Sequence, residues 1–149
     1  RNGKIMRKKI VLLLLTITFF YSCSTSKTSK VDNPLYEVLV VNNDGGANIK
    51  FFEILTEPNE IVMLQSDETL KKKIKAKDVA ESNFVIINSG PTKESYNRVS
   101  IQKVIEKPTE IEVYIKDTQK NIDINLTDEN TKYPYAIVKI NSKKPIVFK

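Results

Sequence analysis

Beyond the N-terminal segment, apolar residues come in short runs, and some of these runs alternate with polar residues. The clearest alternation is Glu110–Asp117, where Ile111, Val113 and Ile115 are separated by charged residues or tyrosine. A second alternating run is Asn121–Leu126. A period of two is typical of β-strands with one buried and one solvated face. Both segments therefore predict half-buried antiparallel strands.

Further runs have the length and the β-branched or aromatic residues of strands, and turn residues separate them. They are Tyr36–Val41, Ile49–Leu55, Glu60–Leu64, Asn83–Asn88, Arg98–Ile105 and Tyr135–Ile140. The run Asn83–Asn88 is apolar through its centre, which predicts a buried strand.

One segment has helical character. It covers residues 67–77, begins with capping and acidic residues and continues with lysines. Leu70 and Ile74 would share one helix face. The lysines favour a solvated face, and docking on anionic lipid is the less favoured alternative. We therefore expect an α+β, mostly β domain, an antiparallel sheet or sandwich of about eight short strands with one helix.

The N-terminal segment has a different pattern. A basic cluster at residues 7–9 precedes Ile10–Phe20, which is apolar except for two threonines. A basic region before an apolar run too short to span a bilayer is typical of a signal peptide. Translation is then expected to start at Met6. A small residue followed by Cys23 ends this region, which resembles the lipobox of bacterial lipoproteins.

Cys23 is the only cysteine in the chain. The lipobox resemblance implies that diacylglycerol is attached to its sulfur and that residues 1–22 are removed. The alternatives are an uncleaved signal anchor and an ordinary secretory signal. Residues 23–34 predict a flexible tether to a single domain, 35–149. Ser24 resembles the pattern sent to the outer membrane, and a periplasm-facing position is favoured over the cell surface.

Composition narrows the function classes. The net charge is +6, but five of the 24 basic residues precede Cys23, which leaves 24 − 5 = 19 basic against 18 acidic residues. Nucleic-acid binding thereby loses its electrostatic argument. The absence of histidine excludes Ser-His-Asp and Cys-His relays and HExxH zinc sites. We identify no catalytic, metal or cofactor site, and no small-molecule substrate, and expect a non-enzymatic protein.

The loop Asn88–Asn97 is the candidate partner-binding site. The proposed contact residues are Pro91, Lys93 and Tyr96 in this loop and Arg98 directly after it. An exposed tyrosine flanked by charge on a β-scaffold is typical of a binding hot spot. The alternative is a hairpin loop whose tyrosine covers the sheet edge.

Two other polar clusters are weaker candidates for a functional site. Glu110 and Glu112 would lie roughly 7 Å apart on one strand face, where they could act as an acid–base pair or bind calcium. A solvated strand face explains them without such a role. Asp44 before Gly45 and Gly46 could begin a metal loop, but further carboxylates are missing. An ordinary hairpin turn is therefore expected there.

The order of these elements resembles a known family. The resemblance lies in the lysine-rich segment after Ser-Asp-Glu, in NFVIINSG at 83–90, in VSIQKV at 99–104, and above all in Thr131–Ile140, where Tyr-Pro-Tyr leads into a Val-Lys-rich strand. These segments are similar to the C-terminal domain of PrcB-like lipoproteins, accessory proteins of secreted protease complexes. The chain departs from the family at Asn97-Arg98, where glycines are usual.

The resemblance implies a membrane-tethered module that binds or stabilises an envelope protein, with an extracytoplasmic protease as the favoured partner. The alternative is a small protease inhibitor that presents the 89–97 loop.

Overall fold

The structure, a computed structural model, describes residues 34–93, 99–117 and 129–149. The chain divides into two units, Arg1–Asp32 and Asn33–Lys149, and every described residue belongs to the second. The described residues form seven strands in two sheets and two short helices. The fold is therefore mostly β and mainly antiparallel, which confirms the predicted fold class.

The larger sheet has four antiparallel strands. Their order is β1 (Tyr36–Asn42), β6 (Tyr135–Ile140), β3 (Asn83–Ser89) and β2 (Lys50–Leu55). β3 and β6 occupy the two central positions, so both edges of each are paired, and hydrophobic cores cover the two faces of the sheet. This placement confirms that the apolar run in Asn83–Asn88 is a buried strand, since almost every residue of β3 is buried.

The smaller sheet has three strands, in the order β4 (Val99–Glu106), β5 (Ile111–Asp117) and β7 (Ile146–Phe148). β4 pairs antiparallel with β5, whereas β7 pairs parallel with it. Ile111 and Val113 are buried, whereas Glu112 and Tyr114, which follow each of them, are partly exposed, as the alternation predicts. The three-residue β7 was not expected, because so short a run carries no readable period.

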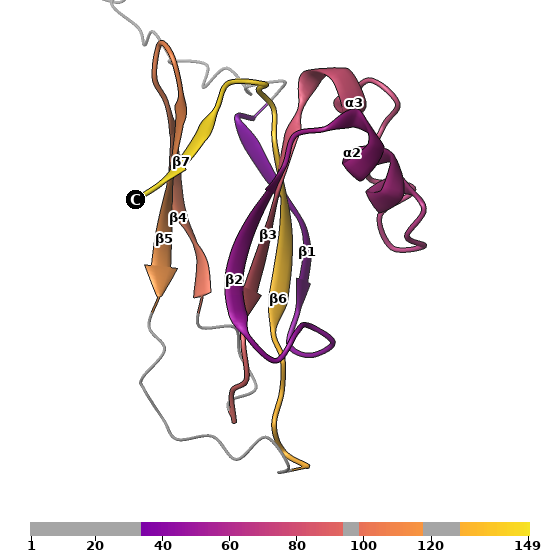
Figure 1. The fold of residues 1–149 in the computed structure, drawn as a ribbon, viewed down its shortest axis with the longest axis vertical. Coiled ribbons are helices and arrows are strands. Elements are labelled where there is room, and N and C mark those ends of the chain that lie inside the picture. The colour runs from indigo at the N-terminus through magenta and orange to yellow at the C-terminus, as the bar shows by residue number, and fades with distance from the viewer. Residues whose placement is uncertain (1–33, 94–98, 118–128) are drawn as a thin grey trace, which may run out of the picture. The chain divides into compact units, whose positions relative to one another are not determined.

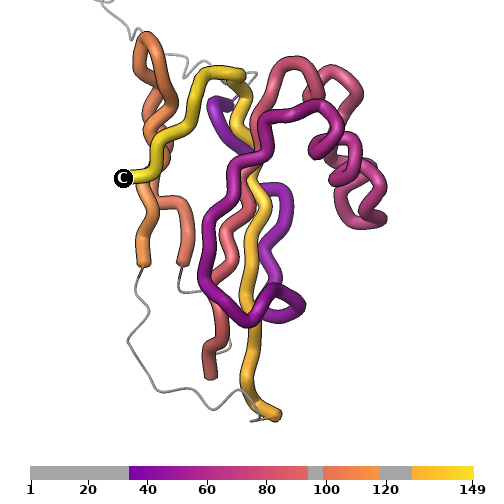
Figure 2. Tube along the Cα trace, viewed as in Figure 1, coloured from indigo at the N-terminus to yellow at the C-terminus, as the bar shows by residue number. Residues whose placement is uncertain are grey.

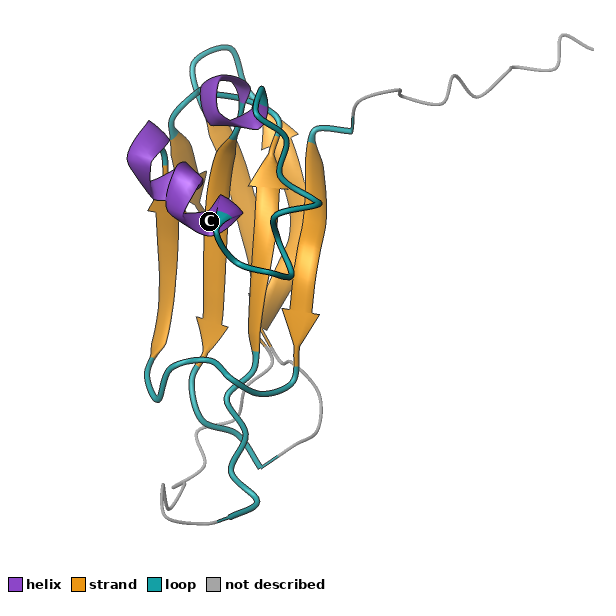
Figure 3. Cartoon of the chain, turned by 90° about the vertical axis from the view of Figure 1, so that its right-hand side faces the viewer, coloured by secondary structure: helices purple, strands orange, loops and turns teal. Residues whose placement is uncertain are grey.

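Two hydrophobic cores hold the layers together. Val85 and Ile87 of β3 point into the core between the two sheets. Phe84 points the other way, into a core covered by α2 (Pro58–Gln65) and the turns that follow it. Figure 1 shows the smaller sheet on one side of the larger sheet and the helices on the other. Figure 3 shows the helices lying across the outer face of the larger sheet.

The expected helix at 67–77 is wrong, because residues 66–77 form successive turns. The Asp67 carboxylate accepts the Thr69 backbone N–H at 2.8 Å, a local bond that competes with helix formation. The N–H groups of Lys73 and Ile74 both donate to the Leu70 carbonyl, which mixes tight and α-helical turns. Leu70 and Ile74 are nevertheless both buried in one core, so the predicted apolar pair is correct.

The expected strand Glu60–Leu64 is also wrong, since these residues form most of α2. Pro58 occupies the first turn, where a proline is tolerated because its missing N–H has no helical partner. The Glu60 carboxylate accepts the backbone N–H groups of Thr56 and Glu57, at 3.2 and 3.1 Å. These start signals outweigh the strand-like run. A second helix, α3 (Asp78–Glu81), follows the turns.

The connection after β1 is not the expected hairpin. β1 and β2 lie at opposite edges of the larger sheet, so residues 43–49 cross the ends of β6 and β3 (Figure 2). Gly46 allows a close crossing: its N–H donates to the Tyr133 carbonyl at 2.7 Å, and a Cβ there would lie 2.3 Å from Asn88 Oδ1. Gly45 does adopt the expected positive φ, 98°. The expected strand Asn121–Leu126 lies outside the described residues.

Candidate functional site

A β-bulge in β1 creates an exposed apolar surface. The register of β1 against β6 shifts between Val38 and Val40, which leaves Leu39 as the extra residue. Leu39 and Val40 consequently both pack in the helix-side core. Val38 and Val41 lie on the other face and are 47% and 57% exposed. The bulge thus gathers two valines that strict alternation would place on opposite faces.

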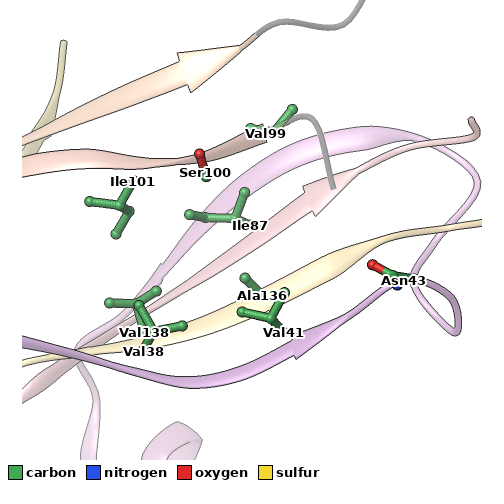
Figure 4. Close-up of a pocket in the computed structure, with 9 residues that line it drawn as sticks. All are labelled: Val38, Val41, Asn43, Ile87, Val99, Ser100, Ile101, Ala136 and Val138. Atoms are coloured by element: carbon green, nitrogen blue, oxygen red, sulfur yellow. The ribbon is translucent and has the colours of Figure 1, made fainter. Parts of the chain in front are cut away.

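These two valines line a cleft of about 370 Å³ between the sheets (Figure 4). The larger sheet and the loop after β1 contribute Val38, Val41, Asn43, Ile87, Ala136 and Val138. β4 contributes Val99, Ser100 and Ile101. Seven of these nine residues are aliphatic, and none of the nine is ionisable. The cleft is therefore suited to an apolar group, with the Asn43 and Ser100 side chains able to hydrogen-bond.

The cleft is open because the two sheets differ in width. β1 is the outermost strand of the four-stranded sheet, and β4 is the outermost described strand of the three-stranded sheet. Both strands line the cleft, so two sheet edges flank it. Apolar surface on β1 that an equally wide second sheet would bury remains accessible. An exposed apolar surface beside two strand edges is typical of a protein-binding region.

The predicted binding loop leads into this cleft. Pro91 is half-buried and Lys93 is exposed on its first arm, and Val99, where β4 begins after it, lines the cleft. Tyr96 and Arg98 lie outside the described residues. The structure therefore places two of the four proposed contact residues, on the arm that leaves the sheet.

The first arm of this loop is fixed to the sheet by its backbone. Gly90 has a φ of 72°, and a Cβ there would lie 2.9 Å from the backbone nitrogen of Lys50. Thr92 and Lys132 form an isolated antiparallel bridge, in which each N–H donates to the other residue's carbonyl at 2.8 Å. The glycine predicted as a loop element thus has a defined role, because only a residue without a side chain fits that crossing.

Asp44 stabilises the crossing loop. Its Oδ1 accepts the backbone N–H groups of Gly45 at 2.9 Å and Tyr133 at 3.0 Å, and Lys132 Nζ lies 3.5 Å from Oδ2. The Tyr133 N–H, then the Gly45 N–H and the lysine charge lower the pKa of this carboxyl below its usual value. Asp44 therefore ties the loop to the residues before β6.

Glu112 is held by groups other than Glu110. Its carboxylate accepts the Tyr114 hydroxyl at 3.0 Å and lies 3.8 Å from Lys107 Nζ and 3.9 Å from Lys149 Nζ. The bond to Glu112 raises the pKa of the Tyr114 hydroxyl. Glu110 lies in the turn before β5, where its carbonyl accepts the Lys107 N–H. These contacts favour a structural role for Glu112 on the outer face of the smaller sheet.

Two buried polar residues were not singled out from the sequence. The buried Asn88 amide provides hydrogen-bond partners for backbone groups of the crossing loop. Its oxygen accepts the Ala47 N–H, and its nitrogen donates to the carbonyls of Ala47 and Ile49. Lys139 in β6 is buried beside Asp78. A polar residue inside a strand that is otherwise apolar is the signal that could have identified both.

Among the described residues, no group of three or more acidic or cysteine side chains could hold a metal ion. None of the helices in this part of the chain is long and apolar enough to cross a membrane. Cys23, the proposed lipid attachment site, lies outside the described residues. Comparison with protein-family models, with curated proteins and with solved structures finds no match to this chain.

Proposed function

We propose that this chain is a non-enzymatic, membrane-tethered envelope lipoprotein that binds a partner protein through the inter-sheet cleft. The observation that carries the proposal is the aliphatic cleft beside β1 and β4, with Val38 and Val41 about half exposed. Completing the burial of each valine in a complex would contribute about 1 kcal/mol or more. Strand edges beside such a surface also allow an extended segment to add to a sheet.

The favoured partner is an extracytoplasmic protease. This choice rests on the resemblance of Thr131–Ile140 and the preceding segments to PrcB-like accessory lipoproteins, and it is part of the proposal. An accessory role requires that the protease keep its activity in the complex. The alternative, an inhibitor, requires that the 89–97 loop block the active site. The described arm of that loop is fixed to the sheet at Gly90 and Thr92, which is compatible with both the accessory role and the inhibitor role.

The test is photo-crosslinking in the native envelope, with p-benzoylphenylalanine placed at Val41 and, as a control, at Val62. Val62 is 49% exposed on α2 and does not line the cleft, so it matches Val41 in type and exposure. We expect the probe at position 41 to crosslink a specific protein, and we expect the probe at position 62 not to crosslink that protein. Equal adducts from both positions would contradict docking at the cleft.

A substitution then measures the contribution of the cleft to binding. Val41→Asp places a charge in the cleft and should weaken binding of the identified partner at least tenfold, with an unchanged melting temperature. Val62→Asp should change neither quantity. If the partner is a protease, assaying it with and without the purified chain distinguishes the two roles. Retained or prolonged activity supports the accessory role, whereas lost activity supports inhibition.

A further inference from the structure

A second apolar hollow lies on the other face of the larger sheet, beside α2. Its volume is about 480 Å³, and its floor includes Leu55, Leu64 and Ile137. Met63 lies at this hollow and is 75% exposed. An exposed methionine can adapt its flexible thioether to different apolar partners.

The hollow carries an unusual set of charges. Three carboxylates line it, those of Glu53, Glu60 and Asp67, and no lysine or arginine does. In the part of the chain that the structure describes, none of these three carboxylates forms an ion pair. Other acidic residues of the domain do, including Glu106, whose carboxylate lies 2.8 Å from Lys144 Nζ.

Two of these carboxylates are held in place by the local fold. The Glu60 carboxylate accepts the N–H groups at the start of α2, and the Asp67 carboxylate accepts the Thr69 hydroxyl and N–H. The bonds from Thr69 also lower the pKa of Asp67, so this group stays ionised at neutral pH. Glu53, on the edge strand β2, is exposed, and its carboxylate has no hydrogen bond within the described residues.

We propose that this hollow binds a polypeptide segment of a partner that presents an aliphatic or aromatic side chain next to lysine or arginine. The apolar floor provides the hydrophobic contact, and the unpaired carboxylates provide charge complementarity to the flanking cations. The same carboxylates repel anionic lipid, which makes a membrane surface a poor occupant. The inference rests on the proposed function only in that the ligand is protein, because the hollow and the cleft share no lining residue.

The chain offers a single-site reporter for this hollow. The sequence contains two methionines, Met6 and Met63, and only Met63 remains once residues 1–22 are removed as proposed, so a Met63→Leu variant identifies its methyl-13C signal. The full chain is titrated with the peptide Ac-Lys-Leu-Lys-Phe-Lys-amide and, separately, with Ac-Glu-Leu-Glu-Phe-Glu-amide. We expect the basic peptide to shift the Met63 methyl signal saturably and the acidic peptide to leave it unchanged. No shift with the basic peptide, or equal shifts with both, would overturn the proposal.

Matched charge variants test where the complementarity lies. Glu53→Gln should raise the Kd for the basic peptide about two- to fivefold, the range for one exposed ion pair. Glu106→Gln removes the same charge from the other sheet and should leave the Kd unchanged. An equal effect of both variants would mean nonspecific attraction and would refute the site. Val41→Asp should not affect this titration, so failure here and failure of the cleft proposal can be told apart.

Discussion

Lys139 is a charged residue in the centre of the larger sheet, and its partners explain how it is tolerated. Its Nζ lies 3.2 Å from Glu37 Oε2 and 3.6 Å from Asp78 Oδ2. Lys139 is only 7% exposed and Asp78 only 2%. The Asp78 carboxylate also accepts the Lys75 N–H at 2.8 Å. Buried charges persist when they are paired and hydrogen-bonded, so this cluster connects β6 to the start of α3.

Replacing Lys139 should therefore destabilise the fold strongly. Lys139→Met keeps most of the unbranched side chain but leaves the Asp78 carboxylate buried without its cation, which costs about 3–5 kcal/mol. Chemical denaturation of the purified chain measures this loss. Lys144→Met is the control, because Lys144 pairs with Glu106 at the surface, where such a pair contributes about 0–1 kcal/mol. Similar losses in both variants would contradict a buried ion pair at Lys139.

At the scale of elements, the hydrogen bonds of the Glu60 side chain stabilise the N-terminus of α2, and this contribution can be measured. The Glu60 carboxylate accepts two N–H groups that have no helical partner, those of Thr56 and Glu57. Glu60→Ala should therefore lower the free energy of unfolding by about 1 kcal/mol, a typical loss for a removed cap. Glu60→Gln should retain most of the stability, because glutamine serves the same position of a capping box. Equal losses for alanine and glutamine would instead indicate a requirement for charge.

The sequence predicts strands better than it predicts the elements between them. β3 and β5 are recognisable because a buried run and a clean alternation are direct consequences of their burial. The segments around Glu60 and Leu70 were misassigned for a different reason. The apolar run around Glu60 is too short to separate helix from strand, and the capping contacts of Glu60 decide it. Around Leu70, the local bond from Thr69 to Asp67 favours turns over a continuous helix.

The candidate sites depend on features that a sequence pattern does not carry. The loop containing Gly90 is recognisable because glycine and proline mark turns. The cleft is not, since it requires the bulge at Leu39 and the unequal widths of two sheets. Both arise from pairing between distant segments, such as Val38 with Val138. The acidic hollow likewise combines residues of β2, α2 and β6 that are far apart in the chain.

At the scale of the whole domain, the two ends of β1 have different roles. The chain enters the domain at Pro34, whose carbonyl accepts the Asn141 amide at 2.6 Å. β1 then runs to Asn42, where the crossing loop begins beside Tyr133. A seven-residue strand is about 23 Å long. If the chain is tethered through the residues that precede Pro34, as proposed, the loop end of β1 is the end of this strand farther along the chain from the tether.

This arrangement requires that the tether be attached to a membrane at Cys23, which is the last prediction. Acyl chains stabilise membrane attachment by about 0.8 kcal/mol per buried CH₂, and two or more chains make it stable. Cells fed with radiolabelled palmitate should therefore label the wild-type chain and deliver it to the membrane fraction. Cys23→Ser should abolish the labelling, because Cys23 is the only thiol in the chain. Equal labelling of both would contradict attachment at Cys23, and the domain would then need another route to the membrane.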